Sequence, residues 1–199
     1  MNDTPRPKGP RCFVAVPLPA DIQRSLSAAI DPAGPLGRAL PDVRWQRKGE
    51  NLHLTLGFLG TLPDERVRAL VAALPSLVSG IEPFPIAVRG LGAFPSARRA
   101  NVIWAGVEDP AGALGRIAGR LAVECDPREA GRPFRAHVTL GRCKAGVDAR
   151  LALGQFGDVI FGRATVAEVH LYQSRLGRHG STYTVLGSAV VAGDADQTR

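Results

Sequence analysis

The sequence predicts an α+β fold, and three observations lead to this prediction. Strand-like and helix-like segments follow one another without the regular alternation of a parallel α/β protein. Tight turns join neighbouring strand-like segments, which favours antiparallel sheet. A four-residue phrase also occurs twice, as His53-Leu54-Thr55-Leu56 and as His137-Val138-Thr139-Leu140. We therefore expect a bilobal fold with two antiparallel sheets, flanked by helices around a central cleft and related by a pseudo-twofold duplication.

The first third of the chain is expected to hold three strands and one helix. Residues 12–17 (CFVAVP) indicate a buried strand, residues 43–46 a short strand, and residues 51–60 the strand with the first phrase. Residues 21–30 suit a helix, because apolar residues recur at helical spacing and an acidic residue stands in the first turn. The stretch 31–42 is rich in Pro and Gly and is expected to be a loop.

The middle third is expected to place a strand pair between two helices. Residues 63–78 carry apolar side chains at helical spacing. Residues 84–94 and 101–107 are expected to be strands joined by a turn at 95–99, and the second of them is rich in β formers. A further helix is expected to start at Asp109-Pro110, since proline is favoured at the first helical position.

The last third is expected to be mostly strand. Residues 134–142 carry the second phrase, and residues 159–172 alternate between apolar and polar side chains like one half-buried strand. Residues 182–186 are expected to pair back after a hairpin turn. The connecting segments are a loop at 127–133, a short helix or strand at 149–153, whose type the residues leave undecided, and the turn at 177–181.

Composition predicts a soluble, cytoplasmic protein. Hydrophobic residues make up 45% of the chain, an ordinary share, and every apolar run ends well short of the ~20 residues of a membrane helix. The N-terminal segment lacks the apolar core of a signal peptide. Polar ends predict flexible tails over 1–10 and 191–199, flanking one bilobal domain over 11–190. No long apolar stripe suggests a subunit interface, so we expect a monomer without an obligate protein partner.

Charge and cysteine content narrow the function further. The net charge of +7 favours partners that carry phosphate. The three cysteines, Cys12, Cys125 and Cys143, are odd in number and form no CxxC pair. This pattern is typical of buried reduced thiols and not of a zinc site or a disulfide framework.

The repeated phrase is the main candidate for chemistry. Residues i and i+2 of a strand point to the same face, so His53 shares a face with Thr55, and His137 shares one with Thr139. Two imidazoles in one cleft can act as general acid and base near neutral pH. Threonine hydroxyls donate hydrogen bonds to phosphate oxygens without carrying charge. Arg142, three residues after Thr139, can add a bidentate contact to the same phosphate.

Other kinds of site fit the residues less well. Zinc usually needs Asp, Glu or Cys beside two histidines, and only Glu50 lies close to either phrase. We therefore expect no metal. Neither a GxSxG nucleophile elbow nor a GxxxxGK[ST] phosphate loop occurs in the chain.

Most of the chain, from about Arg11 to Leu186, resembles the two-histidine phosphoesterases, and within them the RNA 2′,3′-cyclic phosphodiesterases, long labelled 2′-5′ RNA ligases. The markers are RCFVAVPLP, RWQRKGENLHLTLGFLG, LGAFPSARRANVIWAGV, RPFRAHVTLGR and VHLYQSRLGRHGSTYTVL. The resemblance implies hydrolysis of RNA 2′,3′-cyclic phosphate ends to 2′-phosphomonoesters, and the same site run in reverse would make a 2′-5′ bond. It also implies a bilobal fold and catalysis without metal or cofactor.

The resemblance further implies a role for each site residue. His53 is expected to be the proton donor and His137 the proton acceptor, although the symmetry of the phrases makes this assignment nearly arbitrary. Thr55, Thr139 and Arg142 are expected to bind the substrate phosphate.

Other positions in the resembling segments carry weaker expectations. Phe13 matches an aromatic residue that can stack on a nucleobase, a contact worth ~1–3 kcal/mol. Gly57 stands where members of this family often have a larger or charged residue, and we expect it to alter how the cleft wall meets the substrate. Ser174 and Tyr183 are expected to be structural or peripheral.

Two alternative functions stay open. The same site suits a cyclic phosphodiesterase that acts on small nucleotides, and it also suits an RNA-end-binding protein without turnover. Arginine-rich segments at 97–99 and 175–178 favour longer RNA, but they suit a solvated surface equally well.

Overall fold

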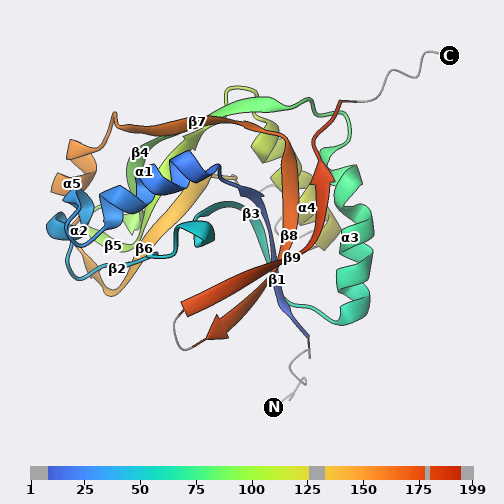
Figure 1. Cartoon of the computed structure of the whole chain (residues 1–199), viewed down its shortest axis with the longest axis horizontal. Coiled ribbons are helices and arrows are strands. Elements are labelled where there is room, and N and C mark those ends of the chain that lie inside the picture. The colour runs from blue at the N-terminus through green and yellow to red at the C-terminus, as the bar shows by residue number, and fades with distance from the viewer. Residues whose placement is uncertain (1–8, 126–132, 178–179, 194–199) are drawn as a thin grey trace.

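The computed structural model describes residues 9–125, 133–177 and 180–193 (Figure 1). The predicted tails over 1–10 and 191–199, the loop at 127–133 and the turn at 177–181 lie wholly or partly outside these residues. Val191, inside the predicted C-terminal tail, is buried, and its N–H donates a hydrogen bond to the carbonyl of Ala167. Ordered packing therefore reaches at least this residue.

The strands form one antiparallel sheet of nine members, which confirms the predicted α+β class. Its order is β7-β4-β5-β6-β3-β1-β8-β9, and β2 pairs with β6 beside this path. The strands are β1 (Arg11–Pro17), β2 (Arg44–Trp45), β3 (His53–Thr61), β4 (Phe84–Ser96), β5 (Arg99–Glu108), β6 (His137–Val147), β7 (Ile160–Val166), β8 (Glu168–Gly177) and β9 (Gly180–Val190).

The helices cover the two halves of this sheet. They are α1 (Ala20–Ile30), α2 (Pro35–Ala39), α3 (Asp64–Val78), α4 (Ala113–Cys125) and α5 (Arg150–Gln155), with a 3₁₀ turn η1 (Gly49–Asn51) before β3. Figure 1 shows α3 and α4 on one side of the molecule and α1, α2 and α5 on the other. Contacts join α3 to β9, α4 to β3, and α1 to β7.

The strand order is symmetric about the boundary between β6 and β3. One lobe holds β1, β3, β8 and β9, and the other holds β4, β5, β6 and β7, so the two predicted sheets meet edge to edge. The segments β1-α1-β3 and β5-α4-β6 repeat the same arrangement, because in each a helix connects two strands that pair with each other. Each connecting helix contacts the other lobe, α1 on β7 and α4 on β3.

Several predicted elements differ in detail from the structure. The prediction of a single strand over 159–172 is wrong, because the strand is interrupted at Ala167. The residues before it form β7, which pairs with β4, and the residues after it form β8, which pairs with β1. The helix predicted from Asp109 starts at Ala113, since Gly112 has a φ of +64° and the Asp109 carboxylate accepts a hydrogen bond from the N–H of Leu114.

The predicted loop at 31–42 contains the short helix α2, which has Pro35 in its first turn. The short element at 149–153, whose type was left undecided, is the helix α5. The three cysteines are free, as predicted; Cys12 and Cys143 are buried and Cys125 is half-buried. Within the described chain, the helices are all too short or too polar to cross a membrane.

Candidate active site

The two repeated phrases meet at the boundary between the lobes. Leu54 of β3 pairs with Val138 of β6 in antiparallel register, and both side chains are fully buried. Extended by one residue each way, this register sets His53 across from Thr139 and Thr55 across from His137. Because Leu54 and Val138 point into the core, these four polar side chains share the opposite face. The structure therefore brings the two predicted His/Thr pairs together.

Both imidazoles are held by the same local hydrogen bond. The His53 Nδ1 lies 2.7 Å from the carbonyl oxygen of Asn51, and the His137 Nδ1 lies 2.7 Å from that of Arg135. A carbonyl oxygen only accepts, so each Nδ1 carries a proton and donates it. Each Nε2 is then the atom left for proton transfer to or from a substrate, as in other oriented catalytic histidines.

The surroundings of the two histidines differ. The His53 ring stacks on Phe13 with centroids 4.7 Å apart and meets Tyr183 edge-on at 5.2 Å. Burial lowers the pKa of His53 below its ordinary value, and the hydrogen bond to Asn51 opposes this shift. His137 instead meets Phe94 edge-on at 5.3 Å. The environment of His53 thus favours its neutral form.

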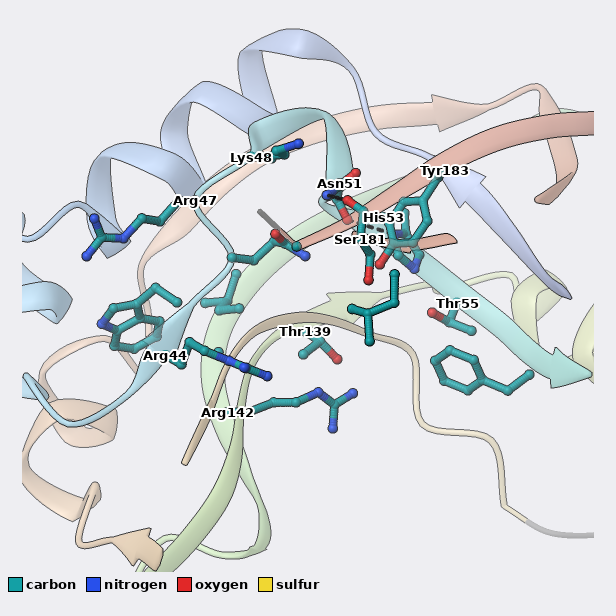
Figure 2. Close-up of a pocket in the computed structure, with 17 residues that line it drawn as sticks. Arg44, Arg47, Lys48, Asn51, His53, Thr55, Thr139, Arg142, Ser181 and Tyr183 are labelled. Atoms are coloured by element: carbon teal, nitrogen blue, oxygen red, sulfur yellow. Dashed lines mark hydrogen bonds between the residues drawn. The ribbon is translucent and has the colours of Figure 1, made fainter. Parts of the chain in front are cut away.

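A cavity of about 510 Å³ opens beside these residues (Figure 2). His53, Thr55, Thr139 and Arg142 line it, whereas His137 is not in its wall and lies across the strand boundary from Thr55. The other lining residues are Arg44, Trp45, Gln46, Arg47, Lys48, Asn51, Phe58, Leu140, Gly141, Leu176, Gly180, Ser181 and Tyr183.

The cavity wall is cationic. Four cations line it, and no Asp, Glu or Cys is found among its described lining residues. This donor set does not resemble a zinc site, which usually combines His with thiolate or carboxylate ligands. It suits an anion.

Arg44 is a site residue that sequence reasoning missed. The β2–β6 pairing sets it directly across from Arg142, and Figure 2 shows both side chains at the cavity. Like charges directly opposite on a sheet repel each other, so this pair indicates a place where an anion is expected to bind. The only signal in the sequence is the cationic group Arg44, Arg47 and Lys48 shortly before the first phrase.

Phe13 lies where a base has almost no access to it. It shares a face with Thr55, but it is only 3% exposed and is covered by aromatic neighbours that include His53, Phe58 and Tyr172. The structure therefore argues against the predicted stacking role and gives Phe13 the role of supporting the His53 ring. Phe58 is 72% exposed and lines the cavity, so it is the aromatic surface available to a base.

A β-bulge explains why Phe58 faces the cavity. Ala15 of β1 pairs with Thr55, and the preceding residue, Val14, pairs with Gly57. Leu56 therefore has no partner in β1 and is an extra residue in β3. The bulge reverses the alternation of faces after Thr55. A Cβ on Gly57 would lie 2.8 Å from the Leu121 side chain of α4. Gly57 thus faces a helix and does not form the cleft wall, contrary to prediction.

The β8–β9 hairpin lines the cavity with Leu176, Gly180, Ser181 and Tyr183. Tyr183 lines the cavity and meets His53 edge-on, so of the two roles expected for it, structural or peripheral, its position fits the structural one. Burial raises the pKa of Tyr183, and a hydrogen bond with the Ser181 side chain and the nearby charge of Arg142 oppose the rise. Asn51, a buried polar residue without a sequence signal, donates a hydrogen bond of 2.8 Å to the carbonyl of Ser181 and so ties η1 to this hairpin.

Comparison with known proteins agrees with this site. The family described as LigT like phosphoesterase matches residues 16–104, which include His53 and Thr55. The RNA 2′,3′-cyclic phosphodiesterase of Methanothermobacter thermautotrophicus is 34% identical over 179 residues, with 87% of this chain and 95% of that protein covered.

Solved structures share the same architecture. A Thermus thermophilus crystal structure superposes with a TM-score of 0.75 at 29% identity, covering 92% of this chain and 99% of that one. LigT of Escherichia coli in its apo form gives a TM-score of 0.71 at 25% identity, covering 94% and 99%. Fold, paired His/Thr strands and sequence relationship agree, and the chain belongs to the LigT-like phosphoesterases, a family of two-histidine phosphoesterases.

Proposed function

We propose that this enzyme hydrolyses RNA 2′,3′-cyclic phosphate ends to 2′-phosphomonoesters by acid/base catalysis between His53 and His137, without a metal or cofactor. The observation that carries the proposal is the Leu54–Val138 register, which sets the two His/Thr pairs across from each other beside a cationic cavity. The Methanothermobacter relative is an RNA 2′,3′-cyclic phosphodiesterase by name, which supports the same activity.

The reaction requires a base and an acid on opposite sides of the phosphorus. In our proposal the His137 Nε2 accepts a proton from water as its oxygen attacks the phosphorus. The bond from phosphorus to the 3′ oxygen breaks, and the His53 Nε2 donates its proton to that oxygen. A lowered pKa makes protonated His53 a stronger acid but leaves less of it protonated near neutral pH, so the donor role rests on the resemblance and not on this shift.

Hydroxyl and guanidinium groups are proposed to hold the phosphate. Thr55 and Thr139 lie on the face shared with the two histidines, and Arg142 lines the same cavity. Their donors would stabilise the negative charge that grows on the equatorial oxygens in the transition state. Run in reverse, the same groups would join a cyclic end to a 5′-hydroxyl through a 2′-5′ bond. We place this activity in a cytoplasmic monomer.

The test is hydrolysis of an oligoribonucleotide with a 2′,3′-cyclic end in the presence of EDTA. We expect the wild-type enzyme to release a 2′-phosphate, identified by phosphorus NMR, and His53→Ala and His137→Ala each to lose this turnover. His170→Ala is the matched control, because His170 lies outside the cavity. Its imidazole contacts the Glu168 carboxylate and is hydrogen-bonded with the Tyr172 hydroxyl. Turnover that survives both active-site substitutions, or that EDTA abolishes, would overturn the proposal.

A further inference from the structure

We propose that Arg44, Arg47 and Lys48 form a second anion subsite, which binds the phosphodiester on the 5′ side of the terminal nucleotide. We call these three residues the cationic segment. The inference rests on the proposed function, because it assumes that the cyclic phosphate sits between the two histidines. It extends that function by making an oligonucleotide, rather than a cyclic mononucleotide, the preferred substrate.

The cationic segment is held close to the reacting phosphate by the fold. Arg44 lies directly across from Arg142 in the β2–β6 ladder. This close approach depends on Gly141, where a Cβ would lie 2.5 Å from a Val43 methyl group and 2.7 Å from the Trp45 ring. The backbone N–H of Gln46 donates a hydrogen bond of 2.8 Å to Leu140 and holds the next part of the segment on β6.

The cationic segment has no counter-ion among the described residues. Elsewhere arginines pair with carboxylates, as in Arg89–Asp158 at 2.9 Å and Arg150–Asp148 at 2.7 Å. In the part of the chain that the structure describes, no carboxylate pairs with the cationic segment or with Arg142. In our proposal Arg142 holds the cyclic phosphate, and the three charges of the cationic segment in the same cavity are neutralised by the next phosphate of the ligand.

The two lobes contribute different side chains to the cavity, which gives the ligand a direction. Phe58, Tyr183 and Leu176 line it from the lobe of β3, β8 and β9, whereas Arg44 is paired with β6 of the other lobe. The exposed fractions of Phe58 and Leu176 are 72% and 86%. Aromatic and apolar surface suits a nucleobase, whereas unpaired cations suit the sugar-phosphate backbone. The terminal base is therefore assigned to the Phe58 side, and the preceding phosphate to the cationic segment.

The test compares three substrates: a cyclic mononucleotide, a dinucleotide with a cyclic end, and the same dinucleotide with an uncharged methylphosphonate linkage. We expect the wild-type enzyme to favour the charged dinucleotide. Arg44→Gln should lower its kcat/KM by about tenfold, the usual effect of removing a charge-assisted hydrogen bond, and should leave the other two substrates nearly unchanged. Arg44→Lys should recover part of the loss.

Arg68→Gln is the matched control, because it removes an exposed arginine from α3, outside the cavity. The salt dependence gives a second readout: Arg44→Gln should make kcat/KM for the charged dinucleotide less sensitive to salt than in the wild-type enzyme, because one charge contact is lost. Equal losses on all three substrates, or no loss on the charged dinucleotide, would overturn the subsite. Failure of the wild-type enzyme to hydrolyse any of them would instead overturn the proposed function.

Discussion

Leu54 and Val138 face each other where the two lobes join, and both side chains are fully buried. These apolar residues carry no chemistry, yet their register determines which polar residues meet on the other face. A slip of one residue would exchange the faces and turn the histidines into the core. The junction is therefore expected to couple stability to catalysis.

The first prediction concerns this junction. Leu54→Ala should lower the free energy of unfolding by about 2–5 kcal/mol, the usual cost of a cavity left by a buried leucine. It should also lower kcat, because β3 loses its buried contact at the boundary. Leu74→Ala is the control, since Leu74 is equally buried but belongs to α3. Denaturant unfolding and kcat measured on folded protein test this; equal kcat in the two variants would contradict it.

The second prediction concerns the two threonines. Thr55→Val and Thr139→Val keep the shape of the side chain and its preference for strands but remove one donor each. Loss of a single donor to a developing oxyanion usually costs about 10²–10³ in kcat. Thr55→Ser and Thr139→Ser retain the hydroxyl and should keep most of the rate. Steady-state kinetics on a cyclic-ended dinucleotide would show whether the valine variants behave as expected.

The sequence was enough to predict the His/Thr pairs, because a period of two along a strand is a local property. It was not enough for Phe58 or Gly57, because the bulge at Leu56 breaks this period and leaves no mark in the residue pattern. Arg44 was missed for another reason: it meets Arg142 only through the long-range β2–β6 pairing. Local periodicity contains no information on which strands become neighbours.

The third prediction separates Phe13 from Phe58. Phe58→Ala should raise KM for nucleotide substrates by about fivefold or more, since stacking on a base is worth ~1–3 kcal/mol. Phe13→Leu should leave KM nearly unchanged, because Phe13 offers almost no surface to a ligand. It should lower kcat by removing the ring that stacks on His53. A rise in KM for Phe13→Leu alone would restore the base-stacking role first expected for it.

The fourth prediction uses the lowered pKa of His53 as a statement about stability. Burial lowers the pKa of the folded-state imidazole below its unfolded value near 6.5. Between these two pKa values the unfolded chain binds more protons, so the free energy of unfolding should rise with pH through this window. His53→Gln should lack this rise in the free energy of unfolding, because glutamine does not titrate. Urea unfolding of both proteins from pH 5 to 8 tests it, and parallel pH profiles would refute it.

The fifth prediction decides which histidine is the acid. The wild-type profile has the same two limbs for either assignment, so the test uses the residual turnover of His137→Ala, in which His53 is the remaining catalytic histidine. If His53 donates the proton, the residual kcat/KM should fall as pH rises through its lowered pKa, because the protonated form is then lost. If His53 is the base, the residual kcat/KM should instead rise through the same pKa. NMR titration of the His53 ring gives the pKa for comparison with this single limb, and a rising limb would exchange the roles of His53 and His137.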